Sequence, residues 1–376
     1  ERLITLSISP SGTNFNVSLR AEPGQDIERW GFHLNAQKDE YITGLFERTV
    51  DGSQSQSWRQ GKSTEDKSWS EEITTRMNLH GEEVDMIIKP SLALYNPFYL
   101  SSRGYGLFVH GTWPGHYDIC KEIADRIQIS FEDPTLDFRI YTDTDLANIV
   151  KSHTREVGPP ILPPEWVFTP WRWRDNHTDK ETYYDGTPVD APYNSMVVED
   201  ILMMKALDIP CGAYWVDRPW ALDPYGYGDF EWDTDRFPHP QRMIQWVHQH
   251  DQKFLLWIAP WLLGDLGQTA RDKGYALPVI RKGAGEEMVF IDFTNPEARH
   301  WWQEIGPGKM MKMGVDGFKL DRGEALVPLK SNCKAHDGRT CREMINAYPV
   351  EYIKATYEIA RDMHGKHFAL MARAGY

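Results

Sequence analysis

The segment Gly317 to Glu324 (GFKLDRGE) is a short apolar run that ends in a cluster of charges. Residues two apart on a strand share a face, so we expect Lys319 and Asp321 to point the same way, with Phe318 and Leu320 packed on the other face. The ammonium group would favour the ionised form of Asp321, which suits a nucleophile better than a proton donor. A salt bridge that only holds a loop at the strand end explains these residues equally well.

Charged residues also follow other predicted strands in the second half of the chain. The strand-end residues are Arg172 and Arg174, Asp217 and Arg218, Lys319 and Asp321, and Arg373. The carboxyl ends of parallel strands meet at one edge of a sheet, where barrel enzymes build their active sites. The pattern therefore predicts one site made from several strand ends.

The first part of the chain shows short strands and turns. Apolar and polar residues alternate in 14–20 after a turn at 10–13, which predicts a hairpin of strands 3–9 and 14–20 with one buried face. Further strands are expected at 84–89, 106–110, 126–131 and 136–141. Because almost no helical period occurs between these strands, residues 1–142 are expected to form an N-terminal β-sandwich.

A helix and a stiff linker are expected at residues 143–164. Asp143 or Thr144 would cap the helix, and the proline-rich run 158–164 would end it. This run marks the expected domain boundary, because the rhythm of the sequence changes after it.

From residue 165 onward, predicted strands alternate with predicted helices. Strands are expected at 165–173, 211–217, 253–260, 317–321 and 367–372, and helices at 194–207, 240–250, 295–313 and 348–364. Such alternation indicates a parallel sheet covered by helices, either a closed (β/α)8 barrel or an open doubly wound sheet. No Gly-x-Gly-x-x-Gly turn follows a strand, which favours the barrel. Five strands are fewer than the eight of a barrel, so we expect residues 165–376 to form the N-terminal part of a TIM-type barrel that is incomplete in this chain.

Composition argues against several classes of function. A formal net charge of -14, with no run rich in Lys and Arg, argues against nucleic acid as a partner. No apolar stretch reaches the roughly eighteen residues of a membrane span. Cys333 and Cys341 bracket a polar loop, which leaves a disulfide open. A zinc site is the weaker alternative, because neither Cys-x-x-Cys nor His-Glu-x-x-His occurs.

Several separated segments carry a resemblance to one known family. They are 96–109 (NPFYLSSRGYGLFV), 214–220 (YWVDRPW), 257–261 (WIAPW), 288–296 (MVFIDFTNP), 314–324 (GVDGFKLDRGE) and 368–376 (FALMARAGY). In this order they resemble glycoside hydrolase family 31, the family of α-glucosidases and α-xylosidases. Arg322 departs from the pattern, since bacterial members carry an aromatic residue at this position.

The resemblance implies a retaining, exo-acting α-glycosidase in which Asp321 is the nucleophile, with an α-glucoside or α-galactoside as the expected substrate. It implies that Asp217 binds hydroxyls of the terminal sugar, that Lys319 bonds a hydroxyl beside the nucleophile, and that Arg373 binds substrate nearby. Trp257 could wall the apolar face of the sugar, although a core role fits nearly as well. No metal and no organic cofactor is expected.

The resemblance also places the acid/base aspartate on a strand after Arg373, outside these residues. We therefore expect residues 1–376 to be one portion of a longer polypeptide whose remainder completes the barrel. Asp229, Asp233 and Asp292 are expected to hold loops and not to replace the acid.

Alternative functions stay open. The same site could resolve its intermediate by transglycosylation or, as in an α-glucan lyase, by elimination, or the barrel could bind carbohydrate without catalysis. The partner expected in each case is an oligosaccharide or glycoside. Arg218 beside Asp217 also leaves an anionic sugar open.

Overall fold

A computed structural model of the chain describes residues 4–22, 27–47, 53–55, 72–74, 77–88, 94–178, 192–279, 281–283, 286–325 and 333–376, together with Thr182 and Gly186. The chain forms two compact units. The first consists of Glu1–Ile161, Arg342–Pro349 and Ala374–Tyr376, and the second of Leu162–Cys341 and Val350–Arg373. Among the helices in the described ranges, none is long and apolar enough to cross a membrane.

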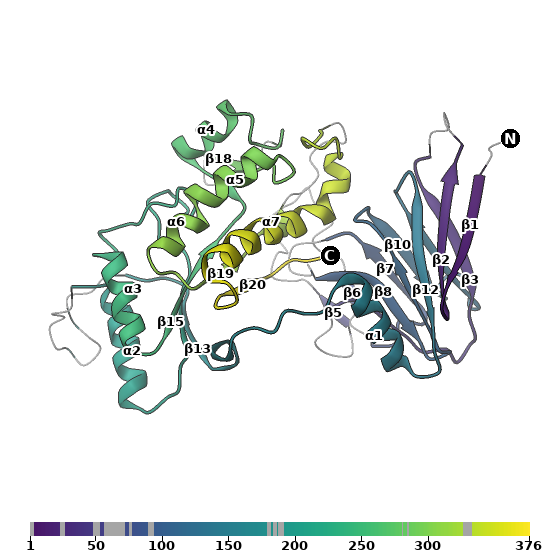
Figure 1. Ribbon diagram of the computed structural model, residues 1–376, viewed down its shortest axis with the longest axis horizontal. Coiled ribbons are helices and arrows are strands. Elements are labelled where there is room, and N and C mark those ends of the chain that lie inside the picture. Colours follow the sequence, from purple (N-terminus) through teal and green to yellow (C-terminus); the bar gives the residue numbers. More distant parts are fainter. Residues whose placement is uncertain are drawn as a thin grey trace. The chain divides into compact units, whose positions relative to one another are not determined.

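Two antiparallel sheets make up most of the first unit (Figure 1). The six-stranded sheet has the order β1-β2-β12-β9-β8-β4, formed by β1 Ile4–Ser11, β2 Asn14–Ala21, β4 Ile42–Phe46, β8 Tyr95–Ser101, β9 Tyr105–Val109 and β12 Leu136–Thr142. The four-stranded sheet has the order β3-β11-β10-β7, formed by β3 Trp30–Asn35, β7 Glu82–Met86, β10 Gly115–Ile119 and β11 Arg126–Phe131. A separate pair consists of β5 Ser53–Ser55 and β6 Glu72–Thr74. Buried side chains of both larger sheets form one hydrophobic core, among them Val17, Tyr99, Leu107, Tyr117 and Ile129.

The predicted N-terminal hairpin is confirmed in its pairing, because β1 pairs with β2 in antiparallel register. Its predicted buried face is wrong for β1, whose residues are all exposed, and in β2 only Val17 is buried. The predicted helix is present as α1 Leu146–Val157, but neither Asp143 nor Thr144 caps it. Asp145 is the cap, and its side chain accepts a hydrogen bond from the N–H of Ala147 at 2.9 Å. The carboxylate of Asp143 instead accepts from the N–H of Asp145 at 2.8 Å, so it shapes the turn before the helix.

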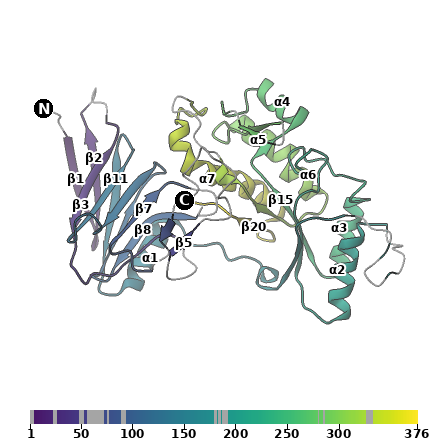
Figure 2. The same ribbon diagram turned by 180° about the vertical axis from the view of Figure 1, so that it is seen from behind.

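A five-stranded parallel sheet is the centre of the second unit. Its order is β13-β14-β15-β19-β20, formed by β13 Trp171–Arg174, β14 Ala213–Val216, β15 Lys253–Ile258, β19 Gly317–Leu320 and β20 Ala369–Ala372. The helices between these strands are α2 Ser195–Ala206, α3 Pro240–Gln249, α5 Pro296–Ile305, α6 Pro307–Lys312 and α7 Cys341–His364. α2 and α3 lie side by side in both ribbon views (Figure 1 and Figure 2). The described strands follow one another across the sheet in chain order, without the reversal that defines a doubly wound sheet.

Three predicted elements of this unit were wrong in their bounds. The strand expected at 165–173 is a 3-10 helix, Glu165–Phe168, followed by β13, because Pro170 lacks the N–H that a continuous strand would use. The helix expected at 295–313 is broken between α5 and α6, because Pro307 lacks an N–H and its ring obstructs the preceding turn. The last helix begins at Cys341 and not at residue 348, and Pro349 lies inside it.

The segment between β15 and α5 contains short elements that were not predicted from the sequence. It contains α4 Gly264–Asp272 and an antiparallel sheet in the order β16-β18-β17, formed by β16 Trp261–Leu262, β17 Arg281–Gly283 and β18 Glu286–Phe290. Strands as short as β16 carry no readable period in a sequence. A disulfide joins Cys333 and Cys341, whose Cα atoms lie 5.3 Å apart, so these thiols are not a zinc pair.

β19 and β20 approach each other unusually closely at Gly317. A Cβ atom built on Gly317 would lie 2.1 Å from the carbonyl oxygen of Ala369, which is a backbone atom and cannot rotate away. This close approach fixes the spacing of the two strands whose carboxyl ends carry Asp321 and Arg373. The lack of a side chain at Gly317 therefore helps to set the distance between Asp321 and Arg373 at the carboxyl ends of these strands.

We predict that Gly317→Ala lowers the free energy of unfolding by about 1–3 kcal/mol, because the added methyl group must push the two strands apart. Gly31→Ala is the matched control in another strand, since its Cβ would come no closer than 3.6 Å to any neighbour. Denaturant unfolding followed by circular dichroism measures both changes. Equal stabilities of the two variants would contradict the steric argument.

Candidate active site

The carboxyl edge of the parallel sheet brings the predicted site residues to one place. Asp217 directly follows β14, Trp257 lies near the end of β15, Asp321 follows β19, and Arg373 follows β20. Leu320 pairs with Ile258 on one side and with Ala372 on the other, so the residues after these strands are neighbours. The sequence prediction that several strand ends form one cluster agrees with this geometry.

The carboxylate of Asp321 is buried, with 5% of the residue exposed, and it is surrounded by donors. Trp257 Nε1 donates a hydrogen bond to Oδ2 at 2.8 Å, and the backbone N–H of Arg322 donates to Oδ1 at 2.9 Å. Lys319 Nζ lies 3.5 Å from Oδ2, and Arg373 Nε lies 2.7 Å from Oδ1. Lys319 and Asp321 thus share a face, as predicted, while the intervening Leu320 is buried.

A second buried carboxylate, Glu324, holds the far side of the Arg373 guanidinium. Arg373 Nη2 donates to Glu324 Oε1, so the guanidinium bridges Glu324 and Asp321. Burial lowers the pKa of Arg373, and the charge of Asp321 opposes that change. No role for Glu324 was predicted from the sequence, although the residue stands only three positions after Asp321 in the same segment. Its part could not be read from the sequence because its partner is 49 residues away.

Lys319 connects Asp321 to a row of aromatic side chains. Its Nζ lies 5.0 Å from the centre of the Trp215 ring, within the range of a cation–π contact. Trp215 stacks on Trp173 with ring centres 5.5 Å apart. Trp173 Nε1 then donates a hydrogen bond to Asp217 Oδ2 at 2.9 Å, which ties the first strand of the sheet to the second. The sequence analysis missed Trp173.

Asp217 is a buried carboxylate with fewer charge partners than Asp321. Its Oδ1 accepts the backbone N–H of Arg218 at 2.7 Å. Burial raises the pKa of Asp217, and the bonds from Trp173 and Arg218 N–H and the charge of Lys319 reduce that rise. A carboxylate in this state can still accept hydroxyl groups of a ligand, since each oxygen has a further lone pair.

Trp257 lies deep in the site, with 2% of the residue exposed. Its ring contacts Tyr227 edge-on at 4.3 Å between centres, and its carbonyl accepts Trp220 Nε1 at 2.8 Å. The Trp257 indole therefore orients Asp321, while Tyr227 packs against its ring and Trp220 binds its backbone carbonyl. Trp220 and Tyr227 were not singled out from the sequence.

Two other strand-end residues serve a different purpose. Arg172 and Arg174 both bind Asp200 of α2, and Tyr214 donates its hydroxyl to the same carboxylate at 2.9 Å. Burial would raise the pKa of Asp200, but the hydrogen bonds from Arg174, Arg172 and Tyr214 outweigh it and lower the pKa. These arginines are thus engaged within the protein, although their strand-end position resembled that of ligand-binding residues.

The three aspartates that were expected to hold loops, Asp229, Asp233 and Asp292, do so. Asp292 accepts the hydroxyl of Thr294 at 2.6 Å and the N–H of His336 at 2.7 Å. Asp229 and Asp233 accept backbone N–H groups two residues ahead of them. Within the described ranges, one cluster has the spacing of metal ligands, namely Glu83, Asp118 and Glu122 of the first unit.

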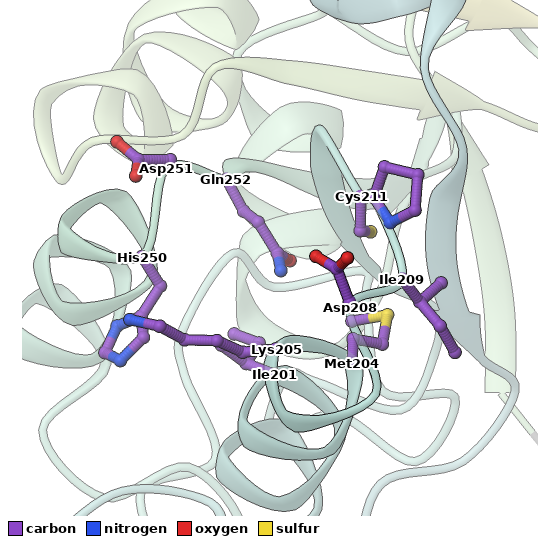
Figure 3. A pocket seen from close by; sticks show the side chains of 10 residues that line it. Ile201, Met204, Lys205, Asp208, Ile209, Cys211, His250, Asp251 and Gln252 are labelled. Carbon is purple, nitrogen blue, oxygen red and sulfur yellow. The ribbon is translucent and has the colours of Figure 1, made fainter.

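A pocket of about 510 Å³ lies at the opposite, amino edge of the sheet (Figure 3). It is lined by the ends of α2 and α3 and by the segments that enter β14 and β15, including Lys205, Asp208, Cys211, His250 and Gln252. Because the strands are parallel, this edge is remote from Asp217 and Asp321. The pocket therefore does not belong to the candidate active site.

Comparison with known proteins identifies the type of domain. The family model described as the glycosyl hydrolases family 31 TIM-barrel domain matches residues 160–376. The α-xylosidase XylQ of Lactiplantibacillus pentosus is 30% identical over 287 residues, covering 73% of this chain and 35% of that protein. An isomaltosyltransferase of Sporosarcina globispora is 28% identical over 294 residues, covering 70% of this chain and 26% of that protein. The chain thus spans about a third or less of the length of these relatives.

A solved structure extends the likeness beyond the matched domain. The family 31 sulfoquinovosidase from E. rectale aligns with a TM-score of 0.76 over 99% of this chain and 55% of that chain. At 18% sequence identity, this likeness shows a shared fold and nothing finer.

Two buried aspartates of this unit differ in the direction of their pKa shifts. Asp316, at the amino end of β19, accepts hydrogen bonds from His248 Nε2 at 2.7 Å, Lys253 Nζ at 3.0 Å and Phe254 N at 2.9 Å. Burial alone would raise its pKa, but these bonds, that of His248 first, lower it. The pKa of Asp217 is instead raised by burial. Ionisation of Asp316 thus stabilises the fold, whereas ionisation of Asp217 costs stability.

We predict opposite effects of the matched variants on the free energy of unfolding at pH 7. Asp316→Asn should lower it by about 1–3 kcal/mol, and Asp217→Asn should leave it unchanged or raise it. The Asp316 difference should shrink as the pH falls from about 4, the ordinary pKa of an aspartate, through the lowered pKa of folded Asp316. The Asp217 difference should shrink earlier, as the pH falls through the raised pKa of folded Asp217 toward about 4, because the folded residue then takes up its proton first. Urea unfolding between pH 7 and pH 3 measures them, and a change of the same sign in both variants would contradict the assignment.

Proposed function

The chain belongs to glycosyl hydrolases family 31, and we propose that it carries the nucleophile side of the active site of a retaining α-glycosidase. The family relatives of this chain are glycoside hydrolases, which act on O-glycosyl bonds. The observation that carries the proposal is the environment of Asp321, a buried carboxylate at a strand end that meets two cations and two N–H donors. Such an arrangement holds a charged carboxylate in one orientation, as a nucleophile requires.

In the proposed reaction, an oxygen of Asp321 attacks the anomeric carbon of the substrate and forms a covalent glycosyl-enzyme. The leaving oxygen takes a proton from a carboxylic acid, and the same group, now a carboxylate, later activates water to release the sugar. The carboxylate of Asp321 must keep nearly one orientation during this exchange. Trp257 and Arg373, which hold different oxygens of its carboxylate, provide that restraint.

We assign the acid/base to a residue outside this sequence. The two carboxyl groups of a retaining enzyme lie roughly 5 to 5.5 Å apart. Glu324 is the other carboxylate of the cluster, and it is bound to Arg373, so it is poorly suited to give and take a proton. On this proposal, residues 165–376 form the first part of a (β/α)8 barrel, residues 1–142 form a β-sandwich domain, and residues 143–164 link them.

The other predicted residues are proposed to bind the sugar. Asp217 would accept hydroxyl groups of the terminal sugar, and Lys319 would bond a hydroxyl beside the nucleophile. Arg373 would contact the substrate next to Asp321. The ring of Trp257 is buried, so its proposed part is the core role of holding Asp321 and not that of a wall for the sugar. A terminal α-glucoside or α-galactoside is the proposed substrate, and the α-xylosidase among the relatives supports the same type of α-linked bond.

Transglycosylation is a second candidate, supported by a relative whose name is isomaltosyltransferase. The two outcomes share the covalent intermediate and differ only in whether water or a sugar hydroxyl resolves it. Chromatography of the products at high substrate concentration distinguishes them, because a transferase builds longer saccharides whereas a hydrolase releases only free sugar.

We predict that Asp321→Asn in the whole protein lowers kcat by about 1,000-fold or more, because no other group can form the covalent intermediate. Asp321→Ala with added azide should recover part of the activity and release a β-glycosyl azide, since the small anion takes the place of the carboxylate. Asp292→Asn is the control, because that carboxylate holds a loop. An Asp321→Asn variant with more than a tenth of wild-type activity would refute the assignment.

The anomeric configuration of the first product gives an independent test. Two successive displacements at the anomeric carbon should release the α anomer, which ¹H NMR detects before mutarotation. If the β anomer appears first, the reaction is a single inversion. Asp321 would then be a base that activates water.

A further inference from the structure

Strand β13 carries tryptophan and arginine in alternation, as Trp171, Arg172, Trp173 and Arg174. Successive side chains of a strand point to opposite faces of its sheet. On one face, Arg172 and Arg174 bind Asp200 of α2. The two tryptophans therefore lie on the face away from α2, and the arginines hold the strand in that orientation.

The face that carries Trp173 also carries Asp217. Trp173 pairs with Trp215 in the parallel register of β13 and β14, and Asp217 stands two residues after Trp215, so all three share a face. The rings of Trp173 and Trp215 stack with centres 5.5 Å apart, and Trp173 Nε1 lies 2.9 Å from Asp217 Oδ2. The register of two neighbouring strands thus brings an indole N–H to the carboxylate.

Two N–H donors of the protein fix the plane of the Asp217 carboxylate. The backbone N–H of Arg218 donates to Oδ1 at 2.7 Å, and Trp173 Nε1 donates to Oδ2 at 2.9 Å. The first donor belongs to the next residue in the chain and moves with Asp217, whereas the second comes from a strand that α2 holds in place. Trp173 is therefore the donor that fixes the carboxylate relative to the sheet. A carboxylate oxygen accepts about two hydrogen bonds, so a ligand hydroxyl can bind Oδ2 together with Trp173.

The hydrogen bond from Trp173 also favours the ionised form of Asp217. Burial raises the pKa of Asp217, and the bond from Trp173 is the first of the interactions that oppose this rise. A protonated carboxyl group would place its proton on one of the two oxygens that accept hydroxyl groups. Trp173 thus supports both the direction and the charge of this carboxylate.

The stack of Trp173 on Trp215 continues to the proposed nucleophile. Lys319 Nζ lies 5.0 Å from the centre of the Trp215 ring and 3.5 Å from Asp321 Oδ2. One continuous set of contacts therefore joins the two strand-end aspartates, in the order Asp217, Trp173, Trp215, Lys319, Asp321. A sugar that must be held by one carboxylate and attacked by the other needs their spacing to be fixed.

Resting on the proposed α-glycosidase function, we propose that Trp173 is a positioning residue for the terminal sugar, because its indole N–H orients Asp217 to bind hydroxyl groups of that sugar. Trp173 acts through Asp217 and not through a contact of its own with the substrate. Its loss should therefore remove only the interactions that Asp217 makes. Selectivity among sugars that differ at the hydroxyls bound by Asp217 should fall with it.

The test measures kcat/KM of the whole protein on the 4-nitrophenyl α-glycoside that it cleaves fastest among the glucoside, galactoside and xyloside, and on the monodeoxy analogues of that glycoside. Trp173→Phe keeps an aromatic ring against Trp215 and removes the N–H. We expect it to lower kcat/KM about tenfold on the full sugar, as the loss of one hydrogen bond to a charged group does. The analogue that suffers least from Asp217→Ala identifies the hydroxyl that Asp217 binds. On that analogue the Trp173→Phe loss should be under about twofold, because the hydroxyl is already absent.

The pH dependence of kcat/KM gives a second measurement. The bond from Trp173 lowers the pKa of Asp217, so its removal should raise that pKa and move the acid limb of the profile to higher pH by about 0.5 to 1 unit. A second variant replaces Trp173 by β-(3-benzothienyl)alanine, whose ring has nearly the same shape but carries sulfur in place of the N–H. It should show both changes even if the Phe variant does not fold.

Trp171→Phe is the matched control, because Trp171 lies two residues earlier on the same face of β13 and its Nε1 donates to the carbonyl of Trp166 at 3.4 Å. This variant should change kcat/KM by one common factor on all substrates and leave the acid limb in place. Equal losses on every substrate in both Trp173 variants, or full activity on the complete sugar, would overturn the proposal and leave the α-glycosidase function in place. A whole protein that cleaves none of the α-glycosides would refute both.

Discussion

The burial of the Asp321 carboxylate is the constraint on which the rest of the site depends. Removing a charge from water costs several kcal/mol unless hydrogen bonds and opposite charges replace the lost hydration. Here the replacements come from β15, β19 and β20 together, through Trp257, Lys319 and Arg373. The parallel register that pairs Ile258, Leu320 and Ala372 is therefore also a requirement of the site, since a shift by one residue would turn these side chains to the other face.

The strand that carries Asp321 is held at both ends. At its amino end, Asp316 binds side chains and backbone of α3 and β15, and the next residue, Gly317, allows β20 to approach closely. At its carboxyl end, Glu324 binds Arg373 from the side opposite Asp321. A group that reacts must be placed to within a fraction of an ångström, and short rigid strands do this better than loops. The loops of this edge can then vary without moving the carboxylate.

The sequence could predict those parts of the site that depend on local periodicity. The two-residue repeat placed Lys319 and Asp321 on one face, and the strand–helix alternation located five parallel strands. It could not predict contacts that join distant segments, such as Trp173 to Asp217 or Glu324 to Arg373. Arg172 shows the same limit, because a partner on the following helix neutralises it. The short-range pattern of the sequence identifies where strands end. Only the packing of distant segments shows which of the charges at these ends have partners within the protein.

The two strand-end carboxylates of the site have different partners. Lys319 and Arg373 are matched by Asp321 and Glu324, which leaves this core of the site close to neutral. Burial raises the pKa of Asp217, and the adjacent Arg218 binds its carboxylate through a backbone N–H. The two carboxylates therefore differ in their partners, because the cations of Lys319 and Arg373 contact Asp321, whereas the neutral N–H donors of Trp173 and Arg218 contact Asp217. A site built in this way can hold one carboxylate rigidly and leave the other able to accept hydroxyl groups of a ligand.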